Sequence, residues 1–91
     1  MKEKKLVSIN LDKERHLYFN LNSLEIIEDL TGKSLDKIGD EMNMKTLKAI
    51  VFAGLKHEDK SLTLEKVGDM IGFEDIQKVS EAIGEAFKGL K

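Results

Sequence analysis

The stretch Leu47–Leu55, with the sequence LKAIVFAGL, decides how this chain folds, because Lys48 is its only polar residue. A helix that is apolar on nearly all sides is a buried helix. We therefore expect this segment to be the central element of the core, in a helix that starts at Asn43 or Met44. The rest of the chain must supply the apolar faces that cover it.

Two stretches before the central segment alternate with a period of two residues. They are 5–11 and 15–21, and each has one apolar face: Val7, Ile9 and Leu11, then Leu17, Phe19 and Leu21. Alternation of this kind predicts strands. The short link at 12–14 predicts an N-terminal β-hairpin over 5–21, without the glycine that a tight turn prefers.

The period changes to that of a helix at residue 22. Asn22 is suited to cap this helix, with Glu25 at the third helical position, and Leu21 and Ile26 are spaced as a hydrophobic staple. Gly32 is expected to end the helix. A short helical turn over 35–38, capped by Ser34, is expected to follow.

Two further helices are expected after the central segment. Thr63 caps the first, which Gly72 is expected to stop, and the second runs from about Glu74 to Lys88. The second carries an apolar stripe at steps of three and four: Ile76, Val79, Ile83, Ala86, Phe87 and Leu90. We predict a single α+β domain over 1–91, a hairpin at 5–21 packed on a helical body of about four helical segments at 22–90.

The composition narrows the function classes. The 91 residues are 41% apolar and 35% charged, which is typical of one folded domain. A net charge of −2 argues against a nucleic-acid-binding domain, because such domains have a basic excess. The chain has no cysteine, which excludes disulfides and thiolate metal sites. No apolar run is long enough for a membrane, so a cytoplasmic location is expected.

Two polar groups could carry chemistry. One is His57-Glu58-Asp59, but a zinc site needs three or four converging ligands, and the other histidine, His16, is far off in sequence. We interpret this group as a solvated loop. The other is the acidic trio on the first helix, where acids suit the helix dipole: Glu25, Glu28 and Asp29. No phosphate-binding glycine pattern or nucleophile motif is present, so we expect no catalytic residue, no cofactor and no metal.

The main alternative is a small helix-turn-helix-like DNA-binding regulator using residues 63–87. The lengths of the two helices fit such a motif. However, the recognition helix would begin with Glu74, Asp75 and Gln77, and residues 61–91 hold six acids against four lysines. Phosphate binding needs the opposite sign of charge, so two core helices joined at a glycine are favoured.

The end of the last helix has two interpretations. Ile83, Phe87 and Leu90 can complete the core, or they can form a partner-binding or self-association face. Phe87 and Leu90 are the best candidates for exposure, because a helix at a chain end is easily left partly uncovered.

Three stretches carry a resemblance to a known family. They are NSLEIIEDLTGKSL at Asn22–Leu35, LKAIVFAGLKHED at Leu47–Asp59 and SLTLEKVGDMI at Ser61–Ile71. In these stretches, and in the strand pair before them, the chain resembles the small tail assembly chaperones of long-tailed (siphovirus-type) phages and prophages of Gram-positive bacteria. Together they cover more than half of the chain, and the motifs are structural, not catalytic.

The resemblance implies a non-enzymatic role in building a phage tail. Such chaperones act in the host cytoplasm, are not expected in the mature virion, and tend to self-associate. They bind the tape measure protein, keep its long helices soluble and help to recruit the tail tube protein. They often occur in a short form and in a longer form made by frameshifting. The resemblance supplies no catalytic residue and pins no partner-binding residue to a motif in this chain.

Overall fold

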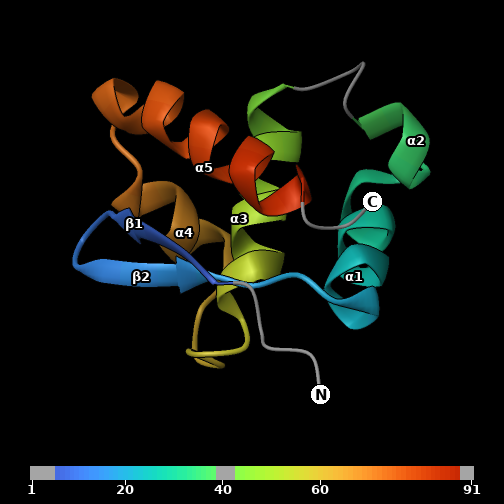
Figure 1. The fold of residues 1–91 in the computed structure, drawn as a ribbon, viewed down its shortest axis with the longest axis horizontal. Coiled ribbons are helices and arrows are strands. Elements are labelled where there is room, and N and C mark those ends of the chain that lie inside the picture. The colour runs from blue at the N-terminus through green and yellow to red at the C-terminus, as the bar shows by residue number, and fades with distance from the viewer. Residues whose placement is uncertain (1–5, 39–42, 89–91) are drawn as a thin grey trace.

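The computed structural model of the protein describes residues 6–38 and 43–88. Its elements, in chain order, are β1 (Val7–Asn10), β2 (Glu14–Leu17), α1 (Leu21–Thr31), α2 (Leu35–Ile38), α3 (Met44–Leu55), α4 (Leu64–Met70), the 3-10 turn η1 (Phe73–Asp75) and α5 (Ile76–Lys88). This order confirms the α+β class, with an antiparallel hairpin ahead of a mainly helical body (Figure 1). Among the described residues, no helix is both long enough and apolar enough to cross a membrane.

Helix α3 is the centre of the molecule, as its sequence predicts. It packs against α1, α4, α5 and β2, and Figure 1 shows it between α1 on one side and the hairpin with α4 on the other. Every residue of 47–55 is buried except Lys48 and Phe52, which are half-buried. Asn43 caps the helix, because its Oδ1 accepts the Thr46 backbone N–H at 2.9 Å.

One face of the hairpin packs against the helices. Val7 pairs with Leu17 and Ile9 with Arg15, so these four side chains share the inner face of the two strands. β2 packs on α3 and β1 packs on α5. The Tyr18 N–H donates to the Gly54 carbonyl at 3.0 Å, which ties the end of the hairpin to the last turn of α3.

A glycine allows this close approach. A Cβ placed on Gly54 would lie 2.7 Å from Phe19 Cζ and 2.9 Å from Leu17 Cδ2. Carbon atoms in good contact are about 3.5–4.0 Å apart, so a side chain here would push the hairpin away from α3. Gly54 therefore sets the spacing between the two parts of the fold.

The predicted start of the first helix was wrong by two residues. Asn20, not Asn22, is the cap: its Oδ1 accepts the Ser23 N–H at 3.0 Å, and Ser23 Oγ accepts the Asn20 N–H at 3.2 Å. This reciprocal pair satisfies two backbone donors, those of Asn20 and Ser23. Leu21 consequently becomes the first helical residue and is 80% exposed, so it forms no staple. The end at Gly32 is confirmed by its left-handed φ of 71°.

The last two helices depart from their predicted boundaries at the connection. Thr63 caps α4 as expected, because its Oγ1 accepts the Lys66 N–H at 3.1 Å. The predicted start at Glu74 instead lies in η1, and α5 begins at Ile76. The Gly72 N–H donates to Asp75 Oδ2 at 3.1 Å, and this bond holds η1 as a separate turn.

Candidate functional site

The structure describes two of the three residues predicted for partner binding, Ile83 and Phe87. Ile83 is only 4% exposed and lies in the core. Phe87 is half-buried and meets Phe19 edge-on, with ring centroids 5.1 Å apart. Leu90 lies outside the described residues. The apolar stripe of α5 therefore packs toward the core as far as Phe87, because β1 and α3 cover it.

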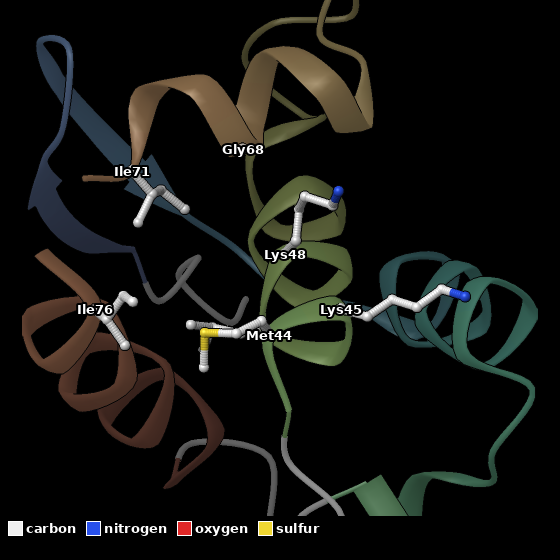
Figure 2. Close-up of a pocket in the computed structure, with 7 residues that line it drawn as sticks. Met44, Lys45, Lys48, Gly68, Ile71 and Ile76 are labelled. Atoms are coloured by element: carbon white, nitrogen blue, oxygen red, sulfur yellow. The ribbon is translucent and has the colours of Figure 1, made fainter. Parts of the chain in front are cut away.

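A different surface has the character of a binding site. A hollow of about 320 Å³ opens between α3, α4 and α5, and Figure 2 shows the side chains around it. Its lining consists of Met44, Lys45, Leu47 and Lys48 from α3, Gly68 from α4, Ile71 just after α4, and Ile76 at the start of α5. We call this hollow, with these seven residues, the apolar groove.

Three elements aim apolar side chains at the middle of the apolar groove. In Figure 2, Met44, Ile71 and Ile76 point toward one another across it. Met44, the first residue of α3, is 59% exposed. Ile71 and Ile76 are half-buried and bracket the connection that holds η1. The connection thus brings two separate helix ends to one apolar wall.

Phe73 extends this apolar character along the connection. It lies between Ile71 and Ile76 in sequence and is 91% exposed, the largest exposed fraction among the large apolar side chains described. Single exposed apolar residues are common on protein surfaces. Here one exposed apolar side chain, Met44, lines the groove, and another, Phe73, lies in the connection between two other lining residues. Exposed apolar surface of this kind marks binding sites.

The charged side chains that line the groove are positive, among the residues that the structure describes. They are Lys45 and Lys48, although the whole chain has a net charge of −2. Within the described part of the chain, neither lysine forms an ion pair. A Cβ on Gly68 would lie 3.2 Å from Lys48 Cδ, so the bare backbone of α4 leaves room for this side chain. The groove can therefore hold apolar groups and place acidic groups beside them.

The structure brings together two polar groups that are far apart in the sequence. His57 Nε2–H donates to the His16 carbonyl at 2.8 Å, and the His16 N–H donates to Glu58 Oε1 at 2.9 Å. Burial raises the pKa of Glu58, but the hydrogen bonds from His16 outweigh it and hold this pKa below its usual value. The segment predicted as a solvated loop therefore also links the end of α3 to β2. The sequence does not indicate this link, because His57 and His16 are 41 residues apart in the chain.

A buried arginine reinforces the same junction. Arg15 is 4% exposed and forms two 2.8 Å bonds to the Asp12 carboxylate, while its Nη1 lies 3.5 Å from Asp59 Oδ2. The bonds from Arg15 lower the pKa of Asp12 to about 2. A signal for this burial was present in the sequence, since Arg15 has the same strand parity as the inward-facing Leu17 and Phe19.

The remaining polar candidates stay apart. Among the residues described, no three histidine or acidic side chains are placed to hold a metal ion. Glu25, Glu28 and Asp29 are exposed on the outer side of α1. Glu74 and Asp75 lie in η1 immediately ahead of α5, where a DNA-reading helix would meet phosphate groups.

Comparison with known proteins yields no relative for this chain. No protein-family model matches it. No curated protein and no solved structure gives a significant match either. We therefore argue its function from the apolar groove and from the resemblance of the three stretches.

Proposed function

We propose that this protein is a non-enzymatic tail assembly chaperone of a long-tailed phage or prophage. In this proposal it binds the tape measure protein in the host cytoplasm, assists assembly of the tail tube protein, and self-associates. The observation that carries the proposal is the apolar groove, together with the neighbouring Phe73, which leaves apolar side chains exposed in the isolated chain.

An exposed apolar surface suits a protein that holds another protein soluble. Such a protein must keep apolar side chains uncovered until its client arrives and must remain soluble while it waits. Here the exposed Met44 and Phe73 lie on a chain in which 35% of the residues are charged. Long client helices have apolar stripes that would otherwise associate with one another, and a groove of this kind can cover part of such a stripe.

The resemblance and the groove involve the same segments. Leu47 and Lys48 belong to the stretch at 47–59, and Gly68 and Ile71 belong to the stretch at 61–71. The stretches that resemble tail assembly chaperones therefore supply more than half of the groove lining. The groove therefore lies largely on the segments that carry the resemblance.

Co-expression with the tape measure protein encoded beside this chain tests the proposal. We expect the wild-type chain to raise the soluble fraction of the tape measure protein and to co-purify with it. The double variant Met44→Gln/Phe73→Ser should lose both effects, because both side chains are exposed and their replacement spares the core. Leu21→Gln is the matched control, since Leu21 is 80% exposed on α1.

Two results would contradict the proposal. One is a wild-type chain that neither solubilises nor captures the tape measure protein. The other is a loss of capture that is equal in the groove variant and in Leu21→Gln, with both variants folded by circular dichroism. The DNA-binding alternative over 63–87 gains no comparable observation, because Glu74 and Asp75 precede α5.

A further inference from the structure

We infer that the apolar groove takes an amphipathic helix of the partner whose apolar stripe is bordered by acidic side chains, which pair with Lys45 and Lys48. This inference rests on the proposed function and specifies the chemistry of the segment that the groove recognises. It concerns a surface on α3, α4 and α5, and not the end of α5.

The shape of the groove favours a helix as the occupant. Its walls are three helical elements, and its apolar side chains converge on one short hollow (Figure 2). A helix presents apolar side chains in a compact group at spacings of three and four residues, which is the way helices dock into grooves. An extended segment would instead pair with a strand edge, and neither β1 nor β2 contributes a residue to the lining.

The charge of the groove favours acidic flanks. Lys45 and Lys48 are three residues apart on α3, so they lie near one another along the same helix. Neither has an acidic partner within the described residues, and the lining is positive on a chain that is negative overall. Acids beside the apolar stripe of a partner would meet these two ammonium groups, whereas basic flanks would be repelled.

The two lysines can pair with acidic side chains of a partner while the middle of the apolar groove remains apolar. A lysine has an apolar stem and a charged end, so it can border an apolar surface and still reach a carboxylate. Figure 2 shows the Lys45 ammonium group directed away from Met44, Ile71 and Ile76. Phosphate groups of a nucleic acid would satisfy the lysines too, but they would leave the apolar floor uncovered.

Two designed peptides test the inference. Each has about 20 residues, long enough for a helix, and is stapled to remain helical. Both carry the same leucine stripe, flanked in one by glutamate and in the other by lysine. Fluorescence anisotropy measures their binding to the wild-type chain, to Lys45→Glu/Lys48→Glu and to the control Lys60→Glu, which changes an exposed lysine outside the groove lining.

We expect the charges at positions 45 and 48 to decide which of the two peptides binds more tightly. The wild-type chain should bind the glutamate-flanked peptide about threefold to tenfold more tightly than the lysine-flanked one, the range for two exposed ion pairs. Lys45→Glu/Lys48→Glu should reverse this order, and Lys60→Glu should keep it. The preference should shrink between about 0.05 M and about 0.5 M salt, because salt screens exposed charges.

Three results would overturn the inference. They are equal or tighter binding of the lysine-flanked peptide, no binding of either peptide, and displacement of the glutamate-flanked peptide by an equal concentration of duplex DNA. If the peptides fail while the tape measure protein is still captured, the inference falls and the proposed function stands. If the glutamate-flanked peptide binds as expected but the tape measure protein is not captured, the proposed function falls.

Discussion

Replacing Gly54 by alanine should separate the hairpin from α3 and destabilise the fold. The added Cβ would lie 2.7 Å from Phe19 Cζ and 2.9 Å from Leu17 Cδ2. Both neighbours are buried, and the Tyr18 N–H is bonded to the Gly54 carbonyl, so the strand cannot move away without loss. The substitution therefore inserts a methyl group where no space exists.

Two opposing contributions decide the magnitude. Inserting a methyl group into a packed core costs about 1–3 kcal/mol. Alanine in place of glycine within a helix gains about 0.5–1 kcal/mol. The net loss should be roughly 1–2 kcal/mol, which lowers the Tm of a domain of this size by roughly 5–15 °C.

Gly84 provides a matched control. It is also a helical glycine, in α5, but a Cβ placed there meets nothing within 4 Å. Gly84→Ala should therefore raise the Tm slightly, through the helical preference of alanine alone. Thermal unfolding followed by circular dichroism measures both variants under one condition.

A double variant tests the cause. In a Phe19→Leu background the atom nearest to the added Cβ is gone, so the further loss caused by Gly54→Ala should be smaller than in the wild type. Equal Tm changes for Gly54→Ala and Gly84→Ala would refute the reasoning. So would a loss from Gly54→Ala that Phe19→Leu leaves unchanged.

Two further perturbations probe the turn before β2, where Asp12 lies, and the cap of α1 after it, at Asn20. Asn20→Ala should lower the free energy of unfolding, measured with urea, by about 1 kcal/mol, because it removes the capping box of α1. Asn22→Ala should change this free energy little. Equal losses for the two variants would contradict the assignment of Asn20 as the cap. The pKa of Asp12 is about 2 in the fold against an ordinary 3.8, so its pairing with Arg15 stabilises the fold above about pH 4 and this contribution is lost as the pH falls toward 2. Asp12→Asn should reduce that acid-induced loss of stability in a urea series from pH 5 to about pH 2, and an unchanged pH profile would exclude the ion pair as its source.

The elements that local patterns govern could be predicted from the sequence. The apolar run at 47–55 identified the central helix, and Thr63 and Gly32 marked helix ends through bonds to nearby residues. The start of α1 was misplaced because Asn20 and Asn22 are both suitable caps. The reciprocal bonds between Asn20 and Ser23 in the structure show which of the two is used.

The features that depend on tertiary contacts could not be found in this way. The role of Gly54 requires the position of Phe19, and the bonds between His57 and His16 join segments that are distant in the chain. The apolar groove depends on which apolar side chains remain uncovered, and an amphipathic pattern does not contain that information. The pattern therefore drew attention to the end of α5, whereas Phe73, the most exposed of the large apolar side chains described, lies just before its start.

Site-specific photo-crosslinking tests the central claim most directly. A photoreactive benzoylphenylalanine replaces Phe73, which is 91% exposed in the connection between the lining residues Ile71 and Ile76, or Leu21, which is 80% exposed on α1. Each variant is co-expressed with the tape measure protein and irradiated. We expect a crosslinked product from position 73 and little or none from position 21. No product from position 73, or equal products from both positions, would contradict the claim that this groove binds the tape measure protein.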